Sequence, residues 1–240
     1  MFFALVCGAL SWRFSQHKAL TRQALEILKA EQPKAYDFFN NKYADYWNDV
    51  IWGSWDPDIF EFGTGTHYYV YPDDGSENVG QYYPNAPRHK NDESSRTRLE
   101  GHWKDAIEEF KSGKLEKTFL SLGRALHYLG DIGCPPHSGG IQYPKNIFET
   151  NYHSLFEKYA KILVDGAAKY HATSAKGYYG KLDEATFGVE INKLCQIAAS
   201  NKDLVLTKDE AKWDQAIVNS FPYAEIYAAV LLERFYREVQ

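Results

Sequence analysis

A histidine and an aspartate four residues apart, His127 and Asp131, close the most regular helical pattern in the chain, which starts near Leu115. Residues at this spacing share one face of a helix, so an imidazole and a carboxylate are presented together. The Gly-Cys-Pro-Pro-His segment that follows ends the helix, because proline lacks the N–H and clashes with the preceding turn. Together with His137, the pair is either a metal-binding group or a capped helix end with two ordinary histidines.

The rest of the chain indicates helices separated by two irregular stretches. Apolar residues recur at helical spacing over 15–30, 35–51, 95–111, 115–130, 146–169, 183–200 and 209–240. The stretch 53–92, rich in Gly, Pro, Asp and Tyr, and the stretch 133–144 have no lasting period. Connections of this length in a compact domain usually carry function. The sequence shows no strand pattern, internal repeat or low-complexity linker, and therefore predicts a single compact all-α domain with two long functional loops.

Composition and charge restrict the class of function. The 240 residues are 44% hydrophobic and 25% charged, which suits a globular protein with a sizeable core, although length alone leaves one or two domains open. Aromatic residues reach 16% and provide amphipathic surface for apolar or stacking ligands. The net charge of -5 and the lack of a Lys/Arg run argue against tight binding of duplex nucleic acid. A nuclease that reaches phosphate through bound metal stays possible.

The first eleven residues are uncharged and almost wholly apolar, and Ala9-Leu10-Ser11 is a small-x-small cleavage pattern. The segment is short for a signal peptide and has no basic start, so it is either a shortened or atypical leader or a hydrophobic helix end. We favour a signal-peptide remnant over 1–11, whose removal leaves Trp12 as the mature N-terminus of a secreted protein. No other apolar stretch is long enough to span a bilayer.

Two of the three cysteines lie beyond this leader, which contains Cys7. Cys134 and Cys195 could pair in an oxidising compartment, but two cysteines are a weak basis for predicting a disulfide. Cys134 stands between two suspected metal ligands. We interpret it as a small buried residue, because the histidines and carboxylates described below complete the expected metal sites without it.

Five of the eight histidines lie in short arrangements with carboxylates. His153 and Glu157 repeat the spacing of four, and His67 follows Asp58 by nine residues. Nitrogen and carboxylate oxygen in this number suit Zn²⁺ with an open position for water. A structural hydrogen-bonded role is the alternative for any single histidine. The candidate ligands are His17, Asp58, His67, His127, Asp131, His137, His153 and Glu157; His89, His102 and His171 have no such company and are expected at the surface or in packing.

In the order of these residues the chain resembles the zinc-dependent phospholipases C, whose all-helical fold is shared with the single-strand-specific zinc nucleases. The resemblance extends over nine matched positions from Trp12 to Glu157 and implies that residues 12–240 form a domain of this type. It implies three zinc ions. The first would be held by Asp58, His67, His127 and Asp131, the second by His137, His153 and Glu157, and the third by the amino group and carbonyl of Trp12 with His17 and a bridging Asp131.

The resemblance also implies the catalytic role of one carboxylate. Both Asp56 and Asp58 are candidates for the first ion, and Asp58 gives the better match to the family pattern. Asp58 would then orient or deprotonate the attacking water as well as contact zinc. The implied chemistry is hydrolysis of a phosphoric diester assisted by paired zinc ions.

Two substrate classes follow from the resemblance. A phospholipase C would release diacylglycerol and a phosphorylated head group. This reading is favoured by Glu157, where the nucleases tend to have aspartate, and by the compact chain, which is similar to one-domain bacterial phospholipases of this type. A single-strand nuclease or 3′-nucleotidase is the alternative, favoured by the close spacing of Trp12 and His17. A non-catalytic zinc-stabilised binding protein is disfavoured, because structural zinc sites are closed.

Aromatic residues near the ligands are candidate substrate contacts. They would form an apolar, cation-accepting pocket for a head group, stack bases, or simply pack under a long loop. These residues are Trp55, Phe60, Phe62, Tyr68 and Tyr69. We expect a monomer that contacts membrane surfaces transiently to reach its phospholipid substrate, with no transmembrane segment and no stable nucleic-acid complex.

Overall fold

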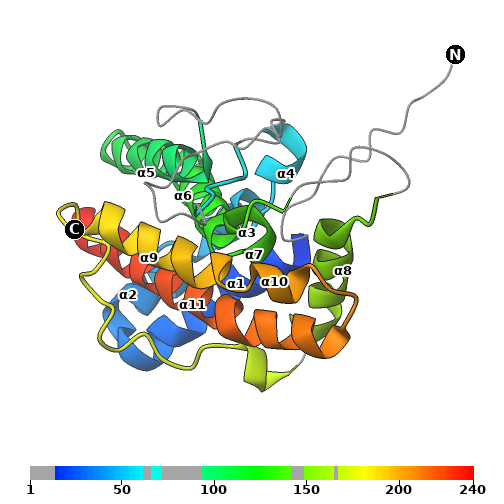
Figure 1. The fold of residues 1–240 in the computed structure, drawn as a ribbon. Coiled ribbons are helices and arrows are strands. Elements are labelled where there is room, and N and C mark those ends of the chain that lie inside the picture. Colours follow the sequence, from blue (N-terminus) through cyan, green and yellow to red (C-terminus); the bar gives the residue numbers. More distant parts are fainter. Residues whose placement is uncertain (1–13, 62–65, 72–92, 142–148, 165–166) are drawn as a thin grey trace, which may run out of the picture.

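The computed structural model describes residues 14–61, 66–71, 93–141, 149–164 and 167–240. Within these ranges the chain forms helices and irregular segments and no sheet (Figure 1), so the predicted all-α class is confirmed. The long helices are α1 (Phe14–Glu31), α5 (Ser95–Lys111), α6 (Leu115–Ile132), α8 (Tyr152–Val164), α9 (Phe187–Ala199) and α11 (Glu210–Glu238). The short elements are α2 (Pro33–Asp37), the π-turn η1 (Phe38–Lys42), the 3₁₀ turn η2 (Ala44–Tyr46), α3 (Trp47–Gly53), α4 (Pro57–Phe60), α7 (Pro135–Ser138), the 3₁₀ turn η3 (Ala168–Tyr170) and α10 (Lys202–Val205).

The helix α6 lies at the centre of the fold, with α3 and α5 packed along it and α1 and α11 nearby. Every residue from 125 to 132 is buried, whereas the first turns of α6 keep one exposed face. A helix segment that is buried all round must lie inside the protein rather than along its surface. The end of α6 that carries His127 and Asp131 is therefore enclosed by other elements.

The sequence predicted one continuous helix over 35–51, and this prediction is wrong. The chain passes instead through α2, the wide turn η1 and the tight turn η2 before α3 begins at Trp47. Asn40 and Asn41 are weak helix formers. The rings of Phe38 and Phe39 are both buried among other aromatic rings, and this packing accompanies the departure from α-helical geometry.

The crossing of α3 and α6 depends on two glycines. A Cβ added at Gly123 would lie 2.3 Å from the carbonyl oxygen of Val50, and one at Gly53 would lie 2.2 Å from the carbonyl oxygen of Leu120. Both contacts are with backbone, which cannot rotate away. The close approach of the two helices fixes the position of α4, which directly follows α3 and carries Asp58.

We expect Gly123→Ala to lower the free energy of unfolding by about 2–3 kcal/mol, because the added methyl group forces the two helix backbones apart. Gly101 on α5 is the matched control, since a Cβ there meets no atom within 4 Å. Gly101→Ala should raise stability by about 0.5–1 kcal/mol through helix propensity alone. Urea unfolding followed by far-UV circular dichroism measures both, and equal stabilities for the two variants would refute the close-packing account.

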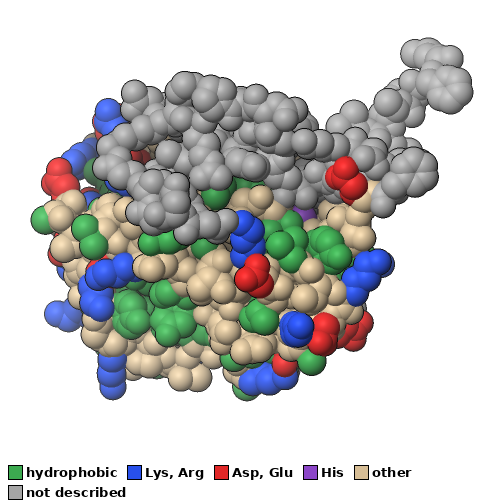
Figure 2. Space-filling model, viewed as in Figure 1, with side chains coloured by type: hydrophobic (Ala, Val, Ile, Leu, Met, Phe, Trp, Pro, Cys, Tyr) green, Lys and Arg blue, Asp and Glu red, His purple; other side chains and the backbone are tan. Residues whose placement is uncertain are grey.

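Side chains of both charge signs are interspersed over the face shown in Figure 2, with apolar side chains between them. No large area of a single sign is visible on the described part of this face. Among the described helices, none combines the length and apolar content that crossing a membrane requires.

Candidate metal centre

One group of side chains, called here the first cluster, meets at the buried end of α6. It consists of His17 from α1, Asp58 from α4, His67 from the segment 66–71, and His127 and Asp131 from α6. Asp131 lies at its middle: Oδ2 is 2.8 Å from His67 Nδ1 and 3.3 Å from His127 Nε2, and Oδ1 is 3.5 Å from His17 Nε2. Four parts of the chain that are distant in sequence thus supply one group of metal-binding atoms.

The ring of His127 is held with Nε2 facing the first cluster. Its Nδ1 lies 3.1 Å from the carbonyl oxygen of Ser54, to which it can donate a proton. Nε2 is then the acceptor nitrogen, 3.8 Å from Asp58 Oδ1. The ring of His17 stacks on that of His127 with centroids 4.1 Å apart. The hydrogen bond from His127 Nδ1 to the Ser54 carbonyl selects the tautomer in which the inward Nε2 can bind a cation.

A second cluster is formed by His137 of α7 with His153 and Glu157 of α8. Glu157 Oε1 is 2.8 Å from His153 Nε2 and 3.4 Å from His137 Nε2. The Nδ1 atom of His137 is 2.7 Å from the carbonyl oxygen of His67, and that of His153 is 2.7 Å from the carbonyl oxygen of Ile141. Both rings are therefore anchored on backbone with Nε2 turned inward, and the first of these bonds links the two clusters.

Burial and charge shift the pKa values of five side chains in the two clusters towards the protonation states that bind cations. Burial lowers the pKa of His127 to about 4 and also lowers the pKa of His17 and His137. Burial acts to raise the pKa of Asp131, but attraction and hydrogen bonding to its histidine neighbours hold it well below its ordinary value. The pKa of Glu157 is lowered in the same way by His153 and His137. Neutral imidazoles and ionised carboxylates are the donors that Zn²⁺ prefers.

The described residues form three sets of possible metal ligands. Within each set the candidate ligand atoms lie within 4.8 Å of one another, and all the residues of the sets are buried. Two belong to the first cluster: His17, Asp58 and His127, and His67, His127 and Asp131. The third is Cys134, His137 and Glu157, at the second cluster. The donor chemistry of both clusters therefore fits zinc.

Comparison with known proteins decides the family. Residues 16–204 match the protein family described as zinc dependent phospholipase C. The chain belongs to the zinc-dependent phospholipase C family. The predicted resemblance is confirmed, and the family is one that depends on the metal for which the two clusters are suited.

Individual relatives are distant and longer than this chain. Two phospholipases C of Bacillus cereus are each 25% identical to it over 135 residues, which is 55% of this chain and 41% of theirs. The match thus spans less than half the length of these relatives. Solved structures of clostridial toxins share the fold. The alpha toxin of Clostridium absonum matches with a TM-score of 0.72 at 21% sequence identity, and the match covers 94% of this chain and 64% of the toxin chain. The alpha toxin of Clostridium perfringens matches with a TM-score of 0.63 at 18% sequence identity, and the match covers 91% of this chain and 63% of the toxin chain.

The structure separates the two candidate carboxylates of the family site. Asp56 is bound by the guanidinium of Arg124 through both oxygens, at 2.6 Å from Nη2 and 3.0 Å from Nε. A bidentate pair of this kind is strong and directional. Asp58, in contrast, shares a set of possible ligand atoms with His17 and His127. The choice of Asp58 over Asp56 as the metal ligand stays a prediction from the sequence, which this placement supports.

Glu61 lies beside the first cluster, and sequence reasoning missed it. Its carboxylate accepts a hydrogen bond of 2.6 Å from the Tyr128 hydroxyl and lies 3.0 Å from His102 Nε2 and 3.6 Å from Arg98. Its carbonyl oxygen is 3.4 Å from His67 Nε2. Burial raises the pKa of Glu61, but these partners outweigh it and lower the pKa to about 2. The only advance signal was its position three residues after Asp58.

We expect Glu61→Gln to destabilise the metal-free protein at pH 7 by about 1–2 kcal/mol, after allowing for solvent screening of a partly exposed group. A carboxylate with a depressed pKa stabilises the fold above its ordinary pKa of 4.5, and this stability is lost as pH falls towards 2. The difference between wild type and variant should therefore shrink between these values. Urea unfolding in chelator at pH 7 and pH 3 tests this, and an unchanged difference would contradict it.

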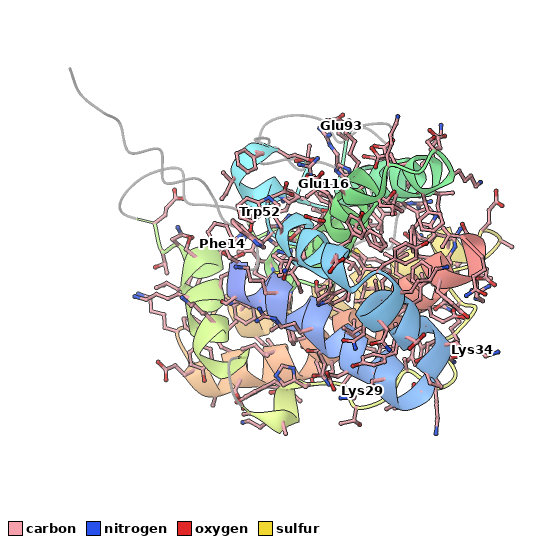
Figure 3. All side chains as sticks on the ribbon, turned by 180° about the vertical axis from the view of Figure 1, so that it is seen from behind. Phe14, Lys29, Lys34, Trp52, Glu93 and Glu116 are labelled. Atoms are coloured by element: carbon pink, nitrogen blue, oxygen red, sulfur yellow. The ribbon has the colours of Figure 1, made fainter. Side chains whose placement is uncertain are left out.

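The predicted aromatic contacts divide into exposed and buried rings. Phe60 is 59% exposed, and Trp55 is half-buried between Phe14 and Trp52, with ring centroids 4.7 and 4.4 Å away. Figure 3 labels Phe14 and Trp52 on the same side of the molecule. Lys18 Nζ lies 4.6 Å from the centroid of the Trp55 ring. These rings form an aromatic surface beside the segment that carries Asp58.

The two predicted tyrosines are buried and have other roles. The Tyr68 hydroxyl is 3.1 Å from His153 Nδ1, behind the second cluster. The Tyr69 hydroxyl donates to Asn192 Oδ1 at 2.6 Å and accepts from Arg96, so Tyr69 joins α9 to α5 and is not brought to either cluster. We therefore do not place Tyr69 among the substrate contacts.

The remaining predicted residues lie outside the clusters or outside the described ranges. Trp12, Phe62, His89 and the leader 1–11 are not in the described residues. His102 stacks on Tyr128, and His171 hydrogen-bonds Glu225 at 2.6 Å, as expected for packing residues. Cys195 donates its thiol hydrogen to the Tyr69 carbonyl. Cys195 and Cys134 are both thiols, so the possible disulfide is not formed.

Proposed function

We propose that this protein is a zinc-dependent phosphoric diester hydrolase that cleaves a phospholipid to diacylglycerol and a phosphorylated head group. The observation that carries the proposal is the convergence of the two clusters. They are joined where the ring of His137 donates to the carbonyl of His67, a residue of the first cluster. The family match and the names of the Bacillus cereus relatives support phospholipid over nucleic acid as substrate.

We further propose three zinc ions, distributed as the family resemblance implies. The first cluster has donors for more than one ion, because His17 approaches Asp131 Oδ1 while His67 and His127 approach Oδ2. This division of its two oxygens supports a bridging role for Asp131. The remaining ligands of the third ion would come from Trp12, as the resemblance implies.

Bound zinc would supply Lewis acidity, lowering the pKa of a water molecule and polarising the phosphoryl oxygens. The residues of the chain perform the other tasks. Asp58, which is 8% exposed and has Oδ1 3.8 Å from His127 Nε2, would orient the attacking water and accept its proton, as the resemblance implies. The backbone carbonyls of Ser54, His67 and Ile141 fix the rings of His127, His137 and His153, so that their geometry is set before substrate binds.

The exposed rings next to this site support a lipid substrate. Trp52 is 47% exposed and Phe60 is 59% exposed, and they lie on the two short helices on either side of Trp55. Aromatic and apolar side chains of this kind favour a membrane–water interface, where the ring leaves bulk water. We propose that the protein contacts the membrane surface transiently through this region. Its secretion and its monomeric state remain predictions from the sequence.

A paired assay tests the proposal. The protein is incubated with phosphatidylcholine vesicles and separately with single-stranded DNA, each with and without chelator. We expect diacylglycerol release that the chelator abolishes and no release of acid-soluble nucleotides. Nucleotide release without diacylglycerol would overturn the lipase assignment in favour of a nuclease.

A further inference from the structure

Cys134 lies at the second cluster, although the sequence indicated that this site is complete without it. Its Sγ is within 4.8 Å of ligand atoms of both His137 and Glu157, and its side chain is fully buried. Cys134 caps α7 and His137 lies within that helix, so the two residues belong to one rigid turn. The spacing Cys-x2-His brings a thiol and an imidazole to the same point.

The local backbone explains this placement. Cys134 has extended backbone angles, φ -92° and ψ 120°, immediately before Pro135 and Pro136, whose rings fix the following turn. Its N–H donates to the carbonyl of Asp131 at 3.0 Å, and its own carbonyl accepts from Ser138 N–H at 3.0 Å. The thiol is therefore held between the end of α6 and the start of α7, where both clusters meet.

The distances suit a shared metal ion. A thiolate sulfur and an imidazole nitrogen on one tetrahedral zinc lie about 3.5 Å apart, given bonds of about 2.3 and 2.0 Å. The donor atoms of Cys134, His137 and Glu157 lie up to 4.8 Å apart, so bringing them to that spacing needs movements of about 1 Å. Rotation about the side-chain bonds of Cys134 and Glu157 would supply such movements.

We propose that Cys134 is a fourth protein ligand of the second cluster and binds its metal as a thiolate. On coordination the S–H bond breaks, the proton goes to solvent and the sulfur keeps the electron pair for the metal. With His137 and Glu157 the sulfur would form the three-donor set of this site, and His153, which lies 2.8 Å from Glu157 Oε1, would supply the fourth donor. A phosphate oxygen would then enter this site only by displacing the sulfur or expanding the coordination. The inference rests on the proposed metal centre and not on the identity of the substrate.

Cobalt replacement provides the direct test, because Co²⁺ bound to a thiolate gives a sulfur-to-metal charge-transfer absorption in the near ultraviolet. Apo-protein is loaded with Co²⁺ to saturation and its spectrum is compared with those of Cys134→Ser and Cys195→Ser. Cys195 is the matched control, since it is equally buried but hydrogen-bonds the Tyr69 carbonyl. We expect the band in wild type and Cys195→Ser and its complete loss in Cys134→Ser.

The absence of the band from cobalt-loaded wild type would overturn the proposal even if the serine variant failed to fold. Persistence of the band in folded Cys134→Ser would overturn it as well. A second measurement uses Cd²⁺, a softer ion than Zn²⁺. Cys134→Ser should lose about ten- to a hundredfold in Cd²⁺ affinity, and an unchanged affinity would count against the thiolate. The spectrum does not depend on hydrolysis, so a protein that fails the lipid assay can still show the band.

Discussion

Replacing Asp131 with asparagine is expected to reduce phospholipid hydrolysis by roughly 10³-fold or more, as for residues that act as one catalytic unit. Asp131 contacts three histidines of the first cluster with its two oxygens. Asparagine has nearly the same shape but no negative charge, and one of its oxygens is replaced by an amide that cannot bind a cation. His127→Ala should have an effect of similar size, because His127 belongs to two of the sets of possible ligand atoms.

The fold should survive these changes, and the far-UV helical signal of Asp131→Asn should remain close to that of wild type. Asp105→Asn is the matched control, since Asp105 is an exposed carboxylate on α5 outside both clusters. It should keep wild-type activity. A folded Asp131→Asn protein that hydrolyses phosphatidylcholine at the wild-type rate would refute the site.

Removal of metal is the second large effect that we expect. Chelator should abolish hydrolysis and also lower the melting temperature, because binding to the folded state alone stabilises it. Each ion present at a hundred times its Kd contributes about 2.7 kcal/mol. In a chain of this length that corresponds to about 5–10 °C per ion.

Zinc should restore both properties, whereas Mg²⁺ should restore neither, because it prefers oxygen ligands in octahedral geometry. Calorimetric melting curves and the lipid assay on the same samples give the two readouts. Full activity and an unchanged melting temperature in chelator would contradict a metal-dependent mechanism.

The helices with the strongest local signals were predictable from sequence. The prediction over 95–111 has the same bounds as α5, where Ser94 and Thr97 form a capping box at the start. The prediction over 115–130 falls two residues short of the end of α6. The break between α2 and α3 was not predictable, because it depends on tertiary packing of Phe38 and Phe39 among aromatic rings rather than on local preference.

The residues of the site likewise divide into those that local sequence spacing predicts and those that only tertiary contacts define. The pairs His127/Asp131 and His153/Glu157 follow from helical geometry, because a spacing of four puts both side chains on one face. The contact of His17 with Asp131 joins α1 to α6, and before the structure only the family resemblance suggested it. The backbone carbonyls that orient the rings have no sequence signal at all. Glu61 was missed because its place beside the site is defined by its neighbours in space.

Zinc content is the most direct measurement of whether the two clusters bind metal. Zinc is determined by mass spectrometry in purified wild type, Asp131→Asn, Glu157→Gln and the control Asp105→Asn. We predict that wild type and Asp105→Asn hold the same amount, and that Asp131→Asn and Glu157→Gln each hold less because a different cluster is damaged in each. Wild-type zinc content in both cluster variants would contradict the account.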